Sequence, residues 1–263
     1  MSRVLREIKP QNISVPWTGL DVLLFLAVWL LPLFASVAIA YIASQPQTQA
    51  TAVDQKDHGH PIAQLIEQGK NSPIVFLVVF LSAVVVAPLV EEFLFRMLFQ
   101  GWLEAKLKQL QIRYASSIAI VVVSCLFAAI HMNNHGAIDV QALLKGLAIS
   151  GVFSLAVFMA GIIYLIQIRN VRIADYLFCA ERLIRPGFFT CAGYCLLAIV
   201  FCLALNAALA TNYPGTNVAP VPIFFFSLAL GILYNRTQKL SDCILLHASL
   251  NGISLMLVWF GAG

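Results

Sequence analysis

Charged residues are scarce in this sequence. Asp, Glu, Lys and Arg make up only 11% of its 263 residues, whereas hydrophobic residues make up 60%. Because about a quarter of the residues in a soluble domain are usually charged, this composition excludes an ordinary soluble protein and indicates a membrane protein. A basic surface with interleaved aromatic residues is also lacking, which excludes nucleic acid as a partner. Internal repeats and low-complexity tracts are absent as well.

Cysteine is present, but its pattern excludes two kinds of site. None of the six cysteines forms a C-x-x-C pair, and most of them lie inside apolar stretches. A disulfide framework or a structural zinc site is therefore not expected. We predict that these residues are small, mostly buried hydrophobic side chains: Cys125, Cys179, Cys191, Cys195, Cys202 and Cys243.

Seven long apolar segments are separated by polar or basic turns. They predict an all-α fold, a polytopic transmembrane bundle of about seven spans. Residues 1–20 form a polar segment on the cytoplasmic side, and residues 21–263 form one membrane-embedded domain. The second segment is too long for one straight crossing at about 1.5 Å per residue, so we expect a kink at Pro88. The segments are 22–43, 73–108, 115–131, 143–168, 188–210, 221–234 and 243–260.

Positive charge is distributed unevenly over the ends and connections of these segments. Thirteen of the sixteen Lys and Arg residues lie in the N-terminal segment or near every second connection, among them the basic connector 169–187. Because basic loops remain in the cytoplasm, the N-terminus is predicted to be inside and the C-terminus outside. In a bacterium the surrounding bilayer would be the plasma membrane, with its lipids as partners.

Three charged residues interrupt the second apolar segment. Glu91, Glu92 and Arg96 lie where a charge costs about 2.5–3.5 kcal/mol on insertion scales, so such residues are usually functional. On a helix Glu92 and Arg96 are neighbours four residues apart, whereas Glu91 points about 100° away. We therefore expect Arg96 to neutralise Glu92, which leaves Glu91 free to face another group.

Two further polar positions are candidates for that group. Glu91 lies 17 residues before Lys108 and His131 lies 17 residues after Tyr114, so a helical hairpin would bring Glu91 and His131 to the same depth. His247 starts from the same face of the membrane and is expected to be somewhat shallower.

These residue types suit the hydrolysis of an amide. A buried glutamate beside a neutral imidazole can act as general base for water. His247 and Asn251, one helical turn apart, can donate hydrogen bonds to an oxyanion. The same set also suits zinc or another divalent metal, held by Glu91, His131 and His247. An ion- or proton-coupled transporter and a non-enzymatic immunity or scaffold protein are the alternative functions.

The chain resembles a known family at these positions. This is the CAAX protease and bacteriocin-processing (CPBP/Abi) family of intramembrane proteases, which includes the type II CAAX prenyl endopeptidases. The stretch from 132 to 220 is longer than in many bacterial members. The three family motifs, E-E-x-x-x-R, F-x-x-x-H and H-x-x-x-N, are matched by Glu91, Glu92 and Arg96, by Phe127 and His131, and by His247 and Asn251.

The resemblance implies an α-helical membrane endopeptidase that acts on a hydrophobic or lipidated peptide, of which a prenylated C-terminus is one example. It implies that Glu91 and His131 activate water, with His247 and Asn251 as oxyanion partners and with Glu92 and Arg96 supporting the site. Both a metal-free glutamate mechanism and a metalloprotease mechanism are compatible with these residues.

The charge asymmetry makes a testable prediction about orientation. Single cysteines placed at Ser44 and Asn170, in a background without the native cysteines, should react with a membrane-impermeant maleimide from opposite sides of sealed membranes. Asn170 should be labelled from the cytoplasmic side. Labelling of both positions from the same side would refute the seven-span arrangement.

Overall fold

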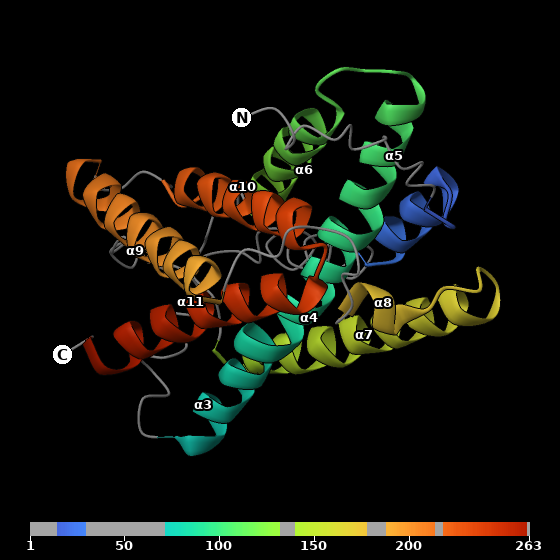
Figure 1. Cartoon of the computed structure of the whole chain (residues 1–263). Coiled ribbons are helices and arrows are strands. Elements are labelled where there is room, and N and C mark those ends of the chain that lie inside the picture. Colours follow the sequence, from blue (N-terminus) through green and yellow to red (C-terminus); the bar gives the residue numbers. More distant parts are fainter. Residues whose placement is uncertain (1–14, 30–71, 132–139, 178–187, 214–217, 262–263) are drawn as a thin grey trace, which may run out of the picture.

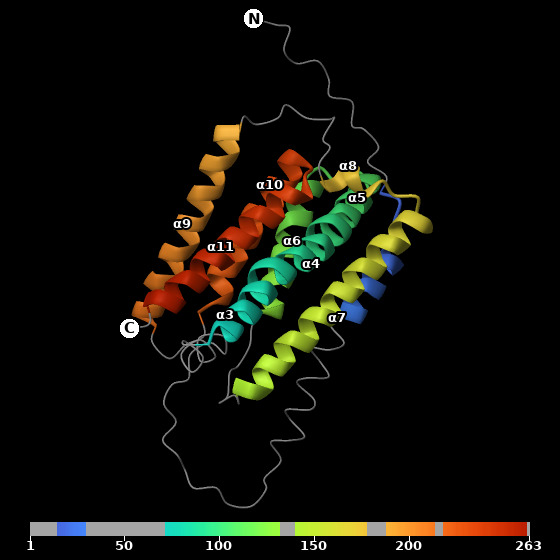
Figure 2. The same cartoon turned by 90° about the horizontal axis from the view of Figure 1, so that it is seen from below.

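The computed structural model describes residues 15–29, 72–131, 140–177, 188–213 and 218–261, and every regular element in these ranges is a helix. The helices lie side by side in one bundle (Figures 1 and 2). The all-α prediction is therefore confirmed. The elements are a first helix Gly19–Trp29, α3 (Pro73–Phe80), the π-helical segment η1 (Leu81–Val86), α4 (Ala87–Glu92), the π-helical segment η2 (Phe93–Gln100), α5 (Gly101–Gln109), α6 (Ala115–Ile130), α7 (Val140–Gln167), α8 (Ile173–Leu177), α9 (Phe188–Asn212), α10 (Pro220–Thr237) and α11 (Leu240–Gly261).

The predicted apolar segments correspond closely to these helices. Segments three to seven are found as α6, α7, α9, α10 and α11, with ends that differ by a few residues. Of the first segment only the part up to Trp29 is described, and the polar loop 44–71 lies outside the described residues. The short helix α8, inside the basic connector, was not predicted because five residues carry too little periodicity.

One continuous helix of 37 residues, Pro73–Gln109, runs through the bundle. Its N-cap residue is Ser72, whose hydroxyl accepts a hydrogen bond from the Val75 backbone N–H. At Pro88, where a kink was expected, the helix is continuous, and it widens into η1 just before that residue. A π-helical turn is a common way to absorb a local mismatch in an α-helix, and such turns often lie at functional sites.

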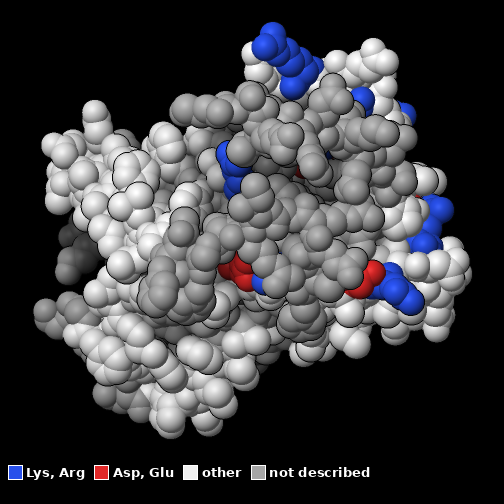
Figure 3. Space-filling model, in the orientation of Figure 1, with Lys and Arg blue, Asp and Glu red and all other residues white. Residues whose placement is uncertain are grey.

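The outer surface is apolar, as expected for a protein in a bilayer. Among the described residues, three helices are long and apolar enough to cross a membrane: Pro73–Gln109, Ala192–Asn212 and Leu240–Phe260. Their outward side chains are large and hydrophobic; Leu197 is 71% exposed and Phe260 is 73% exposed. In Figure 3 the described charges lie mainly along the upper and right edges, over the α5–α6 turn and the α7–α8 end of the bundle. The chain is thus a membrane protein.

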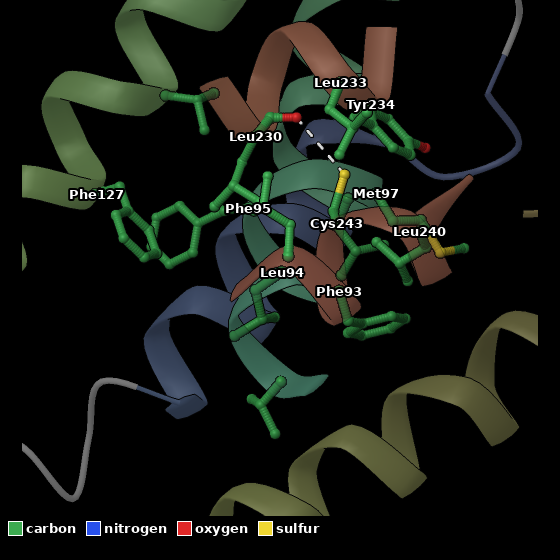
Figure 4. Close-up of a cluster of buried hydrophobic side chains, with 14 of the residues drawn as sticks. Phe93, Leu94, Phe95, Met97, Phe127, Leu230, Leu233, Tyr234, Leu240 and Cys243 are labelled. Carbon is green, nitrogen blue, oxygen red and sulfur yellow. Dashed lines mark hydrogen bonds between the residues drawn. The ribbon is translucent and has the colours of Figure 1, made fainter. Parts of the chain in front are cut away.

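The hydrophobic core is centred on η2. All of its residues except Phe99 are buried, and they contact α10 and α11 as well as α6. Cys243 of α11 donates a hydrogen bond from its thiol to the Leu230 carbonyl at 3.5 Å (Figure 4). Cys202 and Cys243 are buried as predicted, whereas Cys125 is exposed on α6.

An ion pair attaches the first helix to the end of α7. Asp21 accepts hydrogen bonds from Arg169 at 2.6 Å, from the Tyr164 hydroxyl at 2.6 Å and from the Thr18 backbone N–H at 2.6 Å. Burial alone would raise the pKa of Asp21, but these donors outweigh it and lower the pKa to about 2. The carboxylate therefore stays charged and holds the first helix against the bundle.

Candidate active site

The predicted site residues come from four elements that meet inside the bundle. Both glutamates end α4, immediately before the helix changes to the π-helical winding of η2. The remaining groups come from η2, from the C-terminal cap of α6 and from the middle of α11: Arg96, His131, and His247 with Asn251.

Glu92 is fully buried and is held by two partners. Its Oε2 accepts a hydrogen bond from Arg96 Nε at 3.0 Å, and its Oε1 lies 2.9 Å from His247 Nδ1. The predicted Glu92–Arg96 pair is therefore confirmed. A buried charge is tolerated only when it is paired and its remaining hydrogen-bonding groups are satisfied, and both Glu92 oxygens meet this condition.

Arg96 is also fully buried and is fixed from two further sides. Its Nη2 donates a hydrogen bond to the Ser227 hydroxyl of α10 at 2.7 Å. Its guanidinium carbon lies 5.4 Å from the centre of the Phe127 ring, which is a cation–π distance. Sequence reasoning missed Ser227. The feature that could have identified it is its isolated hydroxyl in the apolar run of α10.

Glu91 faces away from this pair, as predicted, and lies between the two histidines. Its Oε2 is 4.0 Å from His131 Nε2 and 3.9 Å from His247 Nε2. Its side chain is 12% exposed, whereas that of Glu92 is inaccessible. The structure thus brings Glu91, His131 and His247 together.

The two depth predictions have different outcomes. The hairpin prediction that Glu91 and His131 are level is confirmed by their 4.0 Å contact. The expectation that His247 is somewhat shallower stays a prediction, although His247 lies close enough to contact both glutamates. Depth depends on helix tilt as well as on the number of residues from a turn, and tilt is not encoded in spacing.

The hydrogen bonds of the two rings define which nitrogen faces Glu91. His131 Nδ1 lies 2.7 Å from the Phe127 carbonyl, which can only accept, so this nitrogen carries the proton. His247 Nδ1 likewise donates to the Glu92 carboxylate. In the neutral rings both Nε2 atoms are therefore acceptors, and they face a third acceptor, the Glu91 carboxylate.

Aromatic rings form the walls around these polar groups. The Phe127 ring lies 4.7 Å from the His131 ring and 5.9 Å from the His247 ring, and Phe226 lies 5.6 Å from the His247 ring. Such walls keep the local dielectric low, which strengthens every electrostatic interaction inside the site.

Asn251 lies beside the site and has an additional role. Its Nδ2 donates a hydrogen bond to the Ala83 backbone carbonyl in η1 at 2.8 Å. In an α-helix that carbonyl would accept from Ala87, but the Ala87 N–H binds Ser82 instead, and the next residue, Pro88, has no N–H. Asn251 therefore satisfies a carbonyl that the proline and the π-helical turn leave without a partner.

The predicted metal ligands do not form a metal site in this arrangement. Within the described ranges, no group of three or more His, Cys, Asp or Glu side chains is placed to hold a metal ion. We therefore derive no chemical step through a metal.

The fold and this site define a polytopic α-helical membrane protein with a glutamate–histidine centre. The family model described as type II CAAX prenyl endopeptidase Rce1-like matches residues 73–172 and 178–253, which include every candidate site residue. The chain belongs to this family, and it is in general terms an intramembrane CAAX-type endopeptidase. Comparisons with curated proteins and with solved structures gave no match.

The contacts predict that the two glutamates affect stability differently. Glu92→Gln leaves the Arg96 charge buried without its counter-ion, and breaking such a pair costs about 3–5 kcal/mol. Glu91→Gln removes no direct hydrogen bond to a described residue, so its melting temperature should stay close to that of the wild type. Thermal melts of the two purified variants in detergent test this, with Arg96→Gln expected to behave like Glu92→Gln. Equal melting temperatures for Glu91→Gln and Glu92→Gln would contradict it.

Proposed function

We propose that this endopeptidase cleaves its substrate with a water molecule activated by Glu91 and His131. The observation that carries the proposal is that the Glu91 carboxylate lies 4.0 Å from His131 Nε2, an acceptor in the neutral ring, and 3.9 Å from His247 Nε2. These separations are too long for direct hydrogen bonds, and a polar contact of this length is typically bridged by water. A water molecule between Glu91 and His131 can donate one hydrogen to each of these two acceptors.

The chemistry then follows from the position of each group. Glu91 takes a proton from water, and the resulting hydroxide attacks the carbonyl carbon of the scissile peptide bond. His131 accepts a hydrogen bond through Nε2 and orients the water, while its Nδ1 stays fixed on the Phe127 carbonyl. When the tetrahedral intermediate collapses, the proton on Glu91 passes to the leaving amine, and the C–N bond breaks.

The oxyanion of that intermediate needs hydrogen-bond donors. Asn251 uses one amide hydrogen on Ala83 and keeps the second for the substrate. His247 can donate from Nε2 only when both ring nitrogens are protonated, and the Glu92 carboxylate on its Nδ1 is a suitable partner for that imidazolium. His131 rests on a neutral carbonyl instead, which suits the acceptor role.

The surface next to α11 suits an apolar substrate. An open groove of about 700 Å³ lies along the helix between Ser249 and Phe260. We propose that the substrate is a membrane-associated peptide with a prenylated C-terminus and that its apolar chain lies in this groove. The groove is lined by Ser249, Gly252, Ile253, Met256, Leu257 and Phe260.

Peptide cleavage by the Glu91 variant tests the proposal. Glu91→Gln should lower kcat by about 100- to 10,000-fold, because the amide cannot accept the proton from water. The measurement is cleavage of prenylated CAAX-type peptides and their unlipidated counterparts by purified protein in lipid vesicles. Asp175→Asn, which neutralises an exposed carboxylate on α8, is the control and should retain full activity. Undiminished cleavage by Glu91→Gln would remove Glu91 from the mechanism.

Substitution of Asn251 separates the oxyanion role from a metal role. Loss of one oxyanion donor typically lowers kcat about 100- to 1000-fold, with a smaller effect on KM, and Asn251→Ala is expected in that range. Asn251→Asp should recover nothing, because a carboxylate can donate neither to Ala83 nor to the oxyanion. If the site instead holds a metal, Asn251→Asp retains activity, a chelator inactivates the wild type and a divalent ion restores it. Kinetics and elemental analysis of the same preparations distinguish the two outcomes.

A further inference from the structure

A row of polar side chains runs from the active site along the inner face of the long helix. Glu92, Arg96, Gln100 and Glu104 follow one another at intervals of four residues, and all four are buried. In a regular α-helix such a row would turn steadily around the axis. The wider winding of η2, between Phe93 and Gln100, reduces that rotation and keeps the row facing the interior.

Helix α10 presents a matching row in the same register. Arg96 contacts Ser227 at 2.7 Å, and Gln100 Nε2 donates to the Gly231 carbonyl at 3.1 Å. One turn further, the Asn235 amide lies 3.3 Å from Glu104. From the antiparallel helix α6, Ser116 donates to Glu104 at 2.7 Å. We call the region bounded by η2, α6 and α10 between the Arg96 and Gln100 levels the polar seam.

Three polar atoms in this seam have no hydrogen-bond partner within the described part of the chain. They are Arg96 Nη1, Gln100 Oε1 and Ser124 Oγ, and all three residues are fully buried. Leaving such a group unsatisfied costs about 1–3 kcal/mol, so buried polar groups in folded proteins normally bind either protein or ordered water. Three neighbouring buried atoms without a hydrogen-bond partner therefore require an explanation.

The packing of α6 places Ser124 between the levels of Arg96 and Gln100. Ser124 is one turn from Phe127, whose ring lies against the Arg96 guanidinium. In the other direction Ser124 is one turn from Ile120, which packs on Gly231 beside Gln100. Ser124 therefore lies on α6 between the contacts made with Arg96 and with Gln100.

The polar seam is closed at its Gln100 end. A Cβ atom added to Gly231 would lie 2.8 Å from Ile120 Cγ2 and 3.1 Å from Gln100 Oε1, so only glycine permits this close approach of α6 and α10. The aromatic ring of Phe127 covers the Arg96 side. A small ligand held between these boundaries is separated from bulk solvent.

We propose that the polar seam is a binding site for ordered water, held by Arg96 Nη1, Gln100 Oε1 and Ser124 Oγ. The three groups offer one donor, one acceptor and one hydroxyl that can do either, which matches the roughly three hydrogen bonds that a buried water makes. The water completes the hydrogen bonding of Arg96 and so holds the guanidinium on Glu92, which in turn fixes the His247 ring. Arg96, Gln100 and Ser124 are thus positioning residues, a role that rests on the function proposed above.

The sign of a stability change tests the water site independently of activity. If Ser124 Oγ binds water, Ser124→Ala leaves that water with a missing partner, and the melting temperature should fall by roughly 2–8 °C. If the hydroxyl is unsatisfied, its removal relieves a buried polar group, and the melting temperature should stay the same or rise. The latter result would overturn the proposal.

Two matched serine variants calibrate this measurement. Ser227→Ala removes a hydroxyl that Arg96 binds directly, so its melting temperature should fall. Ser249→Ala removes an exposed hydroxyl that donates a hydrogen bond to the Leu245 carbonyl of its own helix. The melting temperature of this variant should therefore stay close to that of the wild type. An experimental structure that resolves other buried waters should show water within hydrogen-bond distance of Arg96 Nη1, and a dry seam there would also overturn the proposal.

The positioning role has its own kinetic readout. Ser124→Ala should lower kcat severalfold with KM unchanged, because Arg96 acts on the Glu92–His247 pair and not on substrate binding. Unchanged kcat in a destabilised Ser124→Ala variant would overturn the positioning role. If the wild type cleaves none of the peptides, the proposed function fails, whereas the stability and structural tests of the water site retain their meaning.

Discussion

The buried contact of Glu92 with Arg96 and His247 is the interaction on which the rest of the site depends. Two charges inside an apolar bundle are stable only if each has a partner with good geometry. This condition fixes the relative positions of α4, η2 and α11, since Glu92 bonds Arg96 at 3.0 Å and His247 at 2.9 Å. With Glu92 held by Arg96 and His247, its neighbour Glu91 is left to face the histidines.

The same helix must also solve a backbone problem near Glu91. Pro88 supplies no N–H, and η1 leaves the Ala83 carbonyl without a partner from its own helix. Asn251 provides the missing donor from α11, the helix that also carries His247. Because one helical turn of α11 contacts the long helix at Ala83 and at Glu92, the helix winding and the ring position of His247 are stabilised together.

Sequence reasoning predicted the elements better than the connections between them. Hydrophobic segments locate the helices because membrane burial demands about 20 apolar residues, and the four-residue spacing of Glu92 and Arg96 identifies an ion pair. Sequence reasoning could not predict the π-helical segments η1 and η2, because helix propensity does not report a change in helix winding. It also missed Ser227 and the contact between Asn251 and Ala83, which depend on how distant helices align. The catalytic roles of Glu91, His131, His247 and Asn251 stay predictions.

The two histidines differ in what lies behind each ring, and the proposed mechanism gives them different roles accordingly. Both rings direct Nε2 toward Glu91, yet His131 rests on the Phe127 carbonyl and His247 rests on the Glu92 carboxylate. A neutral acceptor favours a neutral ring that orients water, and an anionic acceptor supports a ring that carries charge toward an oxyanion. In the mechanism proposed above, the group behind each ring separates the two roles: His131 orients water, and His247 donates to the oxyanion. Arg96 contributes to this difference because it holds the Glu92 carboxylate at 3.0 Å.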